Sequence, residues 1–280
     1  MQIHFWGTRG SIAVAGKNTV RYGGNSTCLE LRLDDGNTIV VDAGTGIRGL
    51  GQQLIESGKP VEVHLLMTHI HWDHILGFPF FDPIYVASSR IIIDGTPRAQ
   101  VGLETIFESG LRDGFFPVRF AELRADIQFR KQVEHNLIMV GETTVESIGI
   151  QHPNGGLGFK FMENGKTMVF LTDNELNPEG WKGRKPEDYA RFCRDVDLLI
   201  HDSQYTPEEI TEKRWWGHSD YESVLKMAKE ANVKRLLLTH HDPTHTDLFM
   251  DGMMAKCRDK AREIGFEGDL DAAREETVTL

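Results

Sequence analysis

The chain has 280 residues, 40% of them hydrophobic, and its 31 Lys and Arg stand against 42 Asp and Glu, giving a formal net charge of −11. No run approaches the ~20 apolar residues that a membrane-spanning helix requires. The acidic balance disfavours long DNA or RNA as a partner, because nonspecific nucleic-acid binding depends on Lys and Arg that neutralise phosphates. The N-terminus carries no basic and apolar leader, so we expect a cytoplasmic protein. Three widely spaced cysteines argue against a disulfide framework and a cysteine–zinc site.

The chain up to residue 67 alternates strand-like runs with turns and one helix, which is an α/β pattern. Strands are expected over residues 1–6, 28–33, 38–41 and 61–67, and the apolar spacing over 45–55 predicts a helix. The Asp-Gly pair within Asp34-Asp35-Gly36-Asn37 indicates a hairpin between the second and third strands.

Two early loops, residues 7–11 and 21–27, carry glycines, hydroxyls and one arginine each. Backbone N–H groups, Arg and Ser in such loops can bind a phosphate, so Arg9, Ser11 and Asn25 are candidate phosphate contacts. Ordinary turns with solvated side chains explain the same residues at least as well.

A dense group of metal-ligand residues, Thr68-His69-Ile70-His71-Trp72-Asp73-His74, follows the strand at 61–67. Residues two apart in an extended segment point the same way, so His69 and His71 can bind one cation. Asp73 and His74 lie past the bend and can bind a second. Imidazole and carboxylate are ligands that zinc and similar divalent metals accept, and this density favours a metal site over isolated surface histidines.

The later chain is a series of strands with helices between them. An aromatic stretch at 77–83 covers the metals or lines the cleft, a strand is expected at 91–93 and a helix at 101–107, and the apolar residues of 108–135 indicate packing without a clear element. Further strands are expected at 143–150, 158–162, 167–171, 196–200 and 234–238, and helices at 187–193 and after a capping box of Ser219 and Glu222. With no linker or repeat, residues 1–280 are expected to form one domain.

Each candidate ligand directly follows an apolar strand-like run. This holds for the cluster at 69–74 and for His152, Asp173 and His240. Loops on the same edge of a rigid sheet converge on one cleft, so the repeated placement predicts a shared site.

The ordered set of motifs resembles the metallo-β-lactamase-fold hydrolases. The resemblance rests on five segments: His-x-His-x-Asp-His at 69–74, Asp42-Ala43-Gly44, His152, Thr172-Asp173 and Thr239-His240. It implies an α/β fold, a four-layer αββα sandwich with mixed sheets. The elements His201-Asp202-Ser203 and Gly217-His218-Ser219 resemble the His-Glu-Ala-Thr and His-Ser-Thr elements of tRNase Z. They place the chain closer to the phosphodiesterase branch, with tRNase Z and the cyclic phosphodiesterases, than to β-lactamases or glyoxalase II.

The resemblance implies two divalent cations, which zinc suits and which manganese or iron can replace. The first would be bound by His69, His71 and His152, the second by Asp73, His74 and His240, and Asp173 would bridge them. Physics alone does not decide whether His240 or the adjacent His241 is the metal ligand, and the family's Thr-His placement favours His240. Asp42 resembles a carboxylate that orients a ligand imidazole, although a turn-forming Asp would also fit a strand end.

A two-metal site predicts that a shared hydroxide attacks phosphorus. The resemblance implies that His218 and Asp202 form the pair that protonates the leaving alkoxide, with Asp73 serving catalysis as a metal ligand. The position of His218 just before a helix disfavours imidazolium, so Asp202 has to outweigh that effect. The alternative is a histidine with a structural hydrogen bond near the helix cap.

The expected function is a phosphodiesterase acting on a small anionic substrate such as a cyclic nucleotide. The acidic charge favours it, as does the lack of an obvious Gly-rich, basic arm like that with which tRNase Z holds tRNA. The alternative is a tRNase Z-like RNA 3′-end endonuclease, favoured if residues 112–131 form a basic strip. A second alternative is thioester or lactone hydrolysis, in which His218 and Asp202 would be dispensable. A non-enzymatic metal-stabilised binding protein would need closed coordination. Relatives of the tRNase Z type suggest a homodimer.

Overall fold

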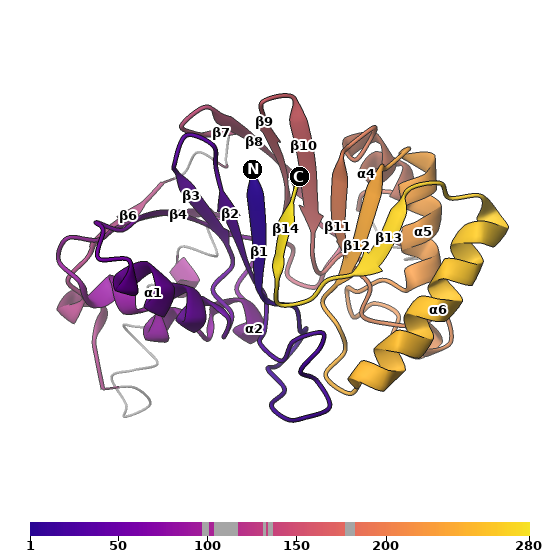
Figure 1. Ribbon diagram of the computed structural model, residues 1–280, viewed down its shortest axis with the longest axis horizontal. Helices are drawn as coiled ribbons and strands as arrows, with labels where there is room; N and C mark the ends of the chain where they lie inside the picture. Colours follow the sequence, from indigo (N-terminus) through magenta and orange to yellow (C-terminus); the bar gives the residue numbers. More distant parts are fainter. Residues whose placement is uncertain (97–100, 104–116, 131–132, 134–136, 177–182) are drawn as a thin grey trace.

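The computed structural model describes residues 1–96, 101–103, 117–130, 133, 137–176 and 183–280. Two seven-stranded sheets stack face to face, and helices cover both outer faces (Figure 1). The expected four-layer αββα sandwich is confirmed. No helix within the described residues is both long and apolar enough to cross a bilayer.

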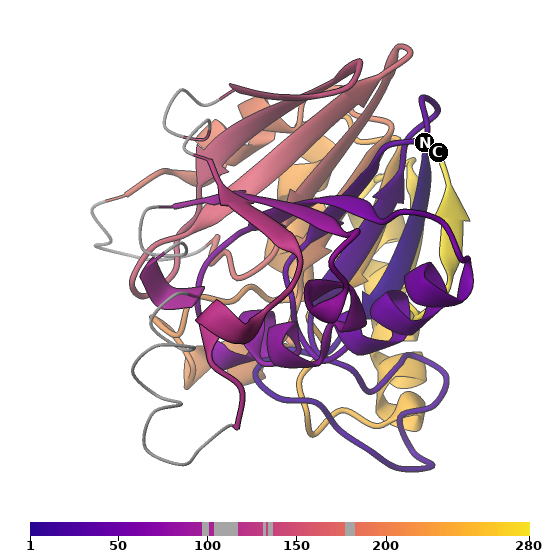
Figure 2. The same cartoon turned by 90° about the vertical axis from the view of Figure 1, so that its left-hand side faces the viewer.

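The first sheet is built from the N-terminal half of the chain and closed by the C-terminus. Its strand order is β14-β1-β2-β3-β4-β5-β6, with bounds β1 Gln2–Gly7, β2 Cys28–Arg32, β3 Thr38–Val41, β4 Glu62–Met67, β5 Arg90–Gly95, β6 Asp126–Phe129 and β14 Thr277–Thr279. Strand β14 pairs antiparallel with β1, so the two termini lie side by side in Figure 1. The outer face of the first sheet is covered by short helices (Figure 2): α1 Ile47–Glu56, α2 Trp72–Ile75, η1 Phe78–Phe80, η2 Asp82–Tyr85 and η4 Phe120–Glu122.

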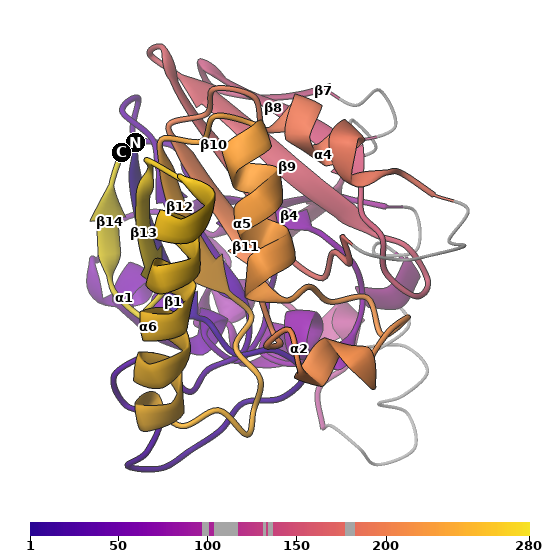
Figure 3. The same cartoon turned by 90° about the vertical axis from the view of Figure 1, so that its right-hand side faces the viewer.

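The second sheet has the order β13-β12-β11-β10-β9-β8-β7. Its strands are β7 Leu137–Val140, β8 Thr143–Gly149, β9 Leu157–Glu163, β10 Lys166–Leu171, β11 Leu198–Asp202, β12 Arg235–Thr239 and β13 Asp269–Ala272. Helices α4 Pro186–Phe192, α5 Tyr221–Glu230 and α6 Asp247–Ile264 cover its outer face (Figure 3), and η6 Glu209–Thr211 lies in the β11–α5 connection. In α5, the buried residues Tyr221, Val224, Leu225 and Ala228 recur at helical spacing and pack on the sheet.

One hydrophobic core lies between the two sheets. Alternate residues of β1, Ile3 and Phe5, point into it and meet Phe159 and Phe161 of β9. This period of two is the reason that the alternating sequence pattern predicts strands. Burying apolar side chains from both sheets holds the sandwich together at about 25 cal/mol per Å² of apolar surface removed from water.

Most expected elements are confirmed, including both hairpins. In the second, Asn164 and Gly165 adopt positive φ values of 49° and 73° between paired residues Glu163 and Lys166, as an Asn-Gly turn requires. Most of the helix expected at 101–107, and part of the stretch 108–135, lie outside the described residues. The described part of that stretch contributes β6, which extends the first sheet at its edge.

The expected capping box before α5 is wrong in its residues. The N-cap is Asp220, whose Oδ1 accepts the backbone N–H groups of Glu222 and Ser223 at 3.0 Å each. The Ser219 hydroxyl instead donates to the carbonyl of Asn174 at 2.6 Å. Ser219 therefore ties the start of α5 to the loop after β10, and the neighbouring carboxylate caps the helix.

Candidate metal centre

The candidate site lies at the carboxyl ends of strands from both sheets, near α2 in Figure 1. Three residues just past the ends of β3, β10 and β12 have left-handed backbone conformations: Asp42 at φ 63°, Asp173, two residues after β10, at 53° and His240 at 61°. Non-glycine residues rarely adopt such angles, and the strain is typically retained at functional sites. Each strand therefore ends in a turn that holds one polar side chain of the site.

The described residues form four overlapping groups of metal-ligand side chains in this cleft, and two of the groups match the proposed ligand sets. The first contains His69, His71 and His152, and the second contains Asp73, His74, Asp173 and His240, with the ligand atoms of each group within 4.8 Å of one another. Six of these seven side chains are buried, and His71 is half-buried. The structure thus brings together all seven residues that the sequence analysis proposed as ligands, in the two groups that it proposed.

The carboxylate of Asp173 lies between the two groups. Its Oδ1 is 3.8 Å from Nε2 of both His69 and His152. Its Oδ2 is 3.1 Å from Nε2 of His74 and 3.3 Å from Nε2 of His240. One oxygen faces each group, which is the arrangement that a bridging carboxylate needs.

Four of the five imidazoles are held by a hydrogen bond from Nδ1, so that Nε2 faces the cluster. The acceptors are Thr68 Oγ1 for His69 at 3.1 Å, Asp42 Oδ2 for His74 at 2.8 Å, the Gly217 carbonyl for His152 at 3.1 Å and Gln204 Oε1 for His240 at 3.0 Å. Such partners fix the tautomer and the orientation of a ligand imidazole. His71 differs, because its Nδ1 lies 2.9 Å from Nε2 of His152.

The cluster has the chemistry of a cation site. The Nε2 atom of His69 is buried without a hydrogen-bond partner, although buried polar atoms are normally satisfied. Burial lowers the pKa of His69 well below its ordinary value and that of His152 to about 4. Both rings are therefore neutral at pH 7, the form that binds metals.

The negative charge of the carboxylates in the cluster favours the protonated form of two histidines. Burial alone would lower the pKa of His240, but the charge of Asp173 and the hydrogen bond to Asp73 raise it to about 9. Burial would also lower the pKa of His74. The charges of three carboxylates nevertheless raise it well above its ordinary value, those of Asp73, Asp173 and Asp42. Protons on these two rings balance charge that divalent ions would balance in their place, so the residues fit a two-metal site.

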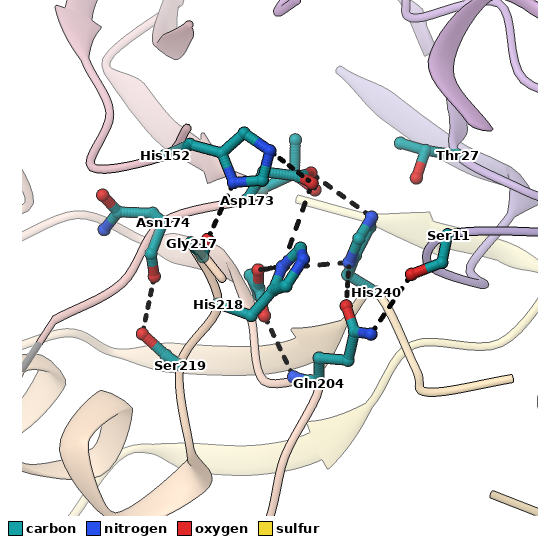
Figure 4. Close-up of polar contacts among 12 residues, drawn as sticks. Ser11, Thr27, His152, Asp173, Asn174, Gln204, Gly217, His218, Ser219 and His240 are labelled. Atoms are coloured by element: carbon teal, nitrogen blue, oxygen red, sulfur yellow. Dashed lines mark hydrogen bonds and ion pairs between the residues drawn. The ribbon is translucent and has the colours of Figure 1, made fainter. Parts of the chain in front are cut away.

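A buried His–carboxylate pair lies beside the cluster (Figure 4). Nδ1 of His218 donates to Oδ2 of Asp202 at 2.7 Å, and Asp202 Oδ1 accepts the backbone N–H of Gln204 at 2.9 Å. Asp202 ends β11, and His218 precedes α5. His218 lines a cleft of about 260 Å³ together with Ser11, His71, Trp72, Asp73, Asp173 and His240.

The order of these residues matches a known family. The sequence model described as "Beta-lactamase superfamily domain" matches residues 37–241, which span the cluster from Asp42 to His240. The chain belongs to the beta-lactamase superfamily. It is a hydrolase of the metallo-β-lactamase fold.

Two curated relatives from this superfamily carry the name Ribonuclease Z. That of Enterococcus faecalis is 27% identical over 286 residues and covers 86% of each chain. That of Latilactobacillus sakei is 25% identical over 313 residues, covering 97% of this chain and 96% of its own. A solved structure, the metallo-beta-lactamase fold protein YhfI from Bacillus subtilis, covers 99% of this chain and 98% of its own at a TM-score of 0.68 and 16% identity, and it shares the fold.

The structure separates the two adjacent histidines after β12. His240 lies in the cluster, whereas Nε2 of His241 donates to the Ala273 carbonyl at 2.9 Å and its ring is fully buried elsewhere. We expect His240→Ala to lose about one metal ion per chain, because a ligand is removed, and His241→Ala to keep both. Metal content of the purified variants, measured by mass spectrometry, checks this, and a larger loss in His241→Ala would reverse the assignment.

Two of the three candidate phosphate contacts are corrected by the structure. Arg9 is fully buried, and its guanidinium donates to the backbone carbonyls of Gly23, Asp242 and His245. It joins two loops and does not face the cleft. The Asn25 amide donates to Glu275 at 3.1 Å, outside the metal cleft.

Ser11 is the candidate that does reach the site. It lines the cleft, its backbone N–H donates to Asp73 Oδ2 at 2.7 Å, and its hydroxyl accepts from Gln204 at 3.3 Å. A phosphate contact from Ser11 stays a prediction.

Two supporting residues in this superfamily member were not found from the sequence. Gln204 connects His240 to Ser11, and Glu175, 1% exposed, accepts the backbone N–H groups of Trp215 and Gly217 at 3.0 Å each. Both follow a proposed site residue by two positions, after β11 and β10. Polar residues that continue past a strand end are the signal that could have pointed to them.

Proposed function

We propose that this hydrolase is a metal-dependent phosphodiesterase that cleaves RNA near a 3′ end, the alternative stated from the sequence. The two Ribonuclease Z relatives support RNA over a small substrate, since the alignments cover 86% and 96% of their lengths. They also weaken the argument from net charge against long nucleic acid.

The observation that carries the phosphodiesterase assignment is the buried contact between His218 and Asp202. A phosphodiester alcohol leaves as a poor alkoxide and needs a proton, whereas a thiolate leaves without one. Asp202 accepts the Nδ1 proton of His218 and so leaves Nε2 as the nitrogen that can donate to the leaving oxygen. A thioester hydrolase would have no use for this pair.

The other residues would position the substrate and the metals. His69, His71 and His152 would hold one divalent ion, Asp73, His74 and His240 the other, and Asp173 both. Two bound ions would supply a nucleophile at neutral pH and positive charge against the phosphoryl oxygens. The imidazole and carboxylate ligands suit zinc, and manganese or iron are the other candidates. Asp42 keeps His74 oriented by accepting its Nδ1 proton at 2.8 Å.

A small phosphodiester such as a cyclic nucleotide is the second candidate. The net charge of −11 favours it, because RNA binding gains affinity from Lys and Arg that release counterions. A basic strip over residues 112–131 would favour RNA, and that stretch lies partly outside the described residues.

A substrate panel tests the proposal directly. Zinc- or manganese-loaded protein is incubated with a tRNA precursor, 3′,5′- and 2′,3′-cyclic AMP, bis(p-nitrophenyl) phosphate and a thioester. We expect cleavage of the precursor at its 3′ side and of bis(p-nitrophenyl) phosphate. Turnover of the cyclic nucleotides with the RNA intact would select the second candidate, and turnover of the thioester alone would overturn phosphodiester chemistry.

A further inference from the structure

Two exposed tryptophans lie close in sequence to residues of the metal site and have no part in the mechanism above. Trp72 is 67% exposed and lines the cleft, and Trp216 is 59% exposed two residues before His218. Tryptophan is normally largely buried, and exposed aromatic surface next to a polar site marks a place of contact.

Each tryptophan is next in sequence to a residue that belongs to or contacts the first metal group. Trp72 is bonded in sequence to His71, and Trp216 to Gly217. The Gly217 carbonyl accepts from Nδ1 of His152, and Nε2 of that ring is 2.9 Å from Nδ1 of His71. The backbones of the two tryptophans are therefore linked through the pair of histidines at the first metal group.

The backbone that carries each indole is fixed. Glu175 is buried and accepts the N–H groups of Trp215 and Gly217, the residues on either side of Trp216. These two neighbours have positive φ values of 72° and 91°, and a Cβ at position 217 would collide with the His152 ring. Such a turn holds its shape before ligand arrives, which lowers the entropy lost on binding.

Trp72 begins the single turn of α2 between two cluster residues. The His74 N–H donates to the His71 carbonyl at 3.0 Å, and the Leu76 N–H donates to the Trp72 carbonyl at 2.8 Å. Trp72 is exposed, whereas the metal-ligand side chains on either side of it, those of His71 and Asp73, point inward. Its indole is thus presented at the cleft by the same turn that carries Asp73 and His74.

We propose that Trp72 and Trp216 form a stacking surface for a nucleobase whose phosphate lies at the metal centre. The proposal rests on the phosphodiesterase function above and adds the side chains that hold the base next to the cleaved phosphate. Among the described residues that line the cleft, Trp72 alone has a large apolar side chain. An acyl chain would find no apolar pocket there, whereas a flat base beside an anionic phosphate matches an indole beside a cation site.

Binding of two phosphate monoesters to the zinc-loaded protein tests the stacking surface. Adenosine 5′-monophosphate and ribose 5-phosphate share the phosphate and the sugar and differ in the base. We expect calorimetry to give about tenfold tighter binding of the nucleotide. Trp72→Ala and Trp216→Ala should each weaken nucleotide binding by about fivefold or more and leave ribose 5-phosphate unchanged, while Trp72→Phe keeps most of the preference.

A matched control separates stacking from a general loss of exposed apolar surface. Leu248 is 79% exposed on α6 and is not among the cleft residues, so Leu248→Ala should bind both ligands as the parent does. Equal affinity of the parent for both ligands, binding of neither, or equal loss of both in Trp72→Ala would overturn the stacking surface.

The outcomes distinguish this inference from the proposed function. A base preference that depends on Trp72 in a protein that hydrolyses no phosphodiester would keep the stacking surface and overturn the phosphodiesterase. Phosphodiester turnover without a base preference would do the reverse.

Discussion

Asp173→Asn is expected to lower phosphodiester turnover by about 10³-fold or more and to reduce bound metal below two ions per chain. The carboxylate oxygens of Asp173 face the two ligand groups separately, at 3.8 Å from His69 and 3.1 Å from His74. An amide keeps the volume but loses the negative charge and one of the two acceptor atoms. The two ions would then lose the shared ligand that holds them together.

The control for Asp173→Asn is Asp197, which precedes β11 and contacts the opposite end of β10 from Asp173. Asp197 accepts the backbone N–H of Thr167 at 2.8 Å, at the start of β10, whereas Asp173 follows its end. Thr167, which Asp197 contacts, and Asp173 are about 20 Å apart along an extended strand. Asp197→Asn should keep both metals and full turnover. Normal turnover of Asp173→Asn with two ions bound would refute the site assignment.

Much of the site could be predicted from the sequence because its residues lie close to the ends of strands. His69 and His71 are two positions apart in the segment that follows β4, and apolar strands end one or two residues before His240 and Asp173. The sandwich and the superfamily are confirmed by the structure and the comparisons. The ligand roles, the single domain, the homodimer and the cytoplasmic location stay predictions.

Contacts between distant loops could not be read from the sequence. The role of Glu175 depends on Trp215 and Gly217, some 40 positions later in the chain. Arg9 was interpreted as a phosphate contact because an arginine in a glycine loop resembles one. Three backbone carbonyls from two loops bind its guanidinium instead, and no local pattern encodes that burial.

The sequence patterns also did not predict short strands at the sheet edges. β6 and β13 have four residues each and β14 has three, too few to show a period of two. They are strands because β5, β12 and β1 offer unpaired edges. The helix before β13 and β14, α6, carries Lys, Arg, Asp and Glu on much of its surface and buries mainly Met250, Met253 and Met254, so its apolar stripe is narrow in the sequence.

His218→Ala is expected to slow substrates with poor leaving groups by about 10²–10⁴-fold, the usual contribution of a general acid. Bis(p-nitrophenyl) phosphate should lose about tenfold or less, because p-nitrophenolate departs without a proton. The ring is 7% exposed and Asp202 is fully buried, so their 2.7 Å hydrogen bond is shielded from water. Asp202→Asn should give the same selectivity for leaving group with a smaller loss, because the histidine remains but its orientation is no longer fixed.

Metal content and a second histidine separate proton donation from a structural role for His218. His64 lies on β4 outside the described cluster, so His64→Ala should preserve both rates. Because His218 is absent from the two proposed ligand groups, His218→Ala should retain two metals while its rates diverge between the two leaving groups. Equal losses on the two substrates would mean that the ring supports the Gly217 turn and does not donate the proton. The ratio of the two rates is therefore the decisive quantity, since a damaged metal site lowers both rates together and a lost acid lowers only the one that needs it.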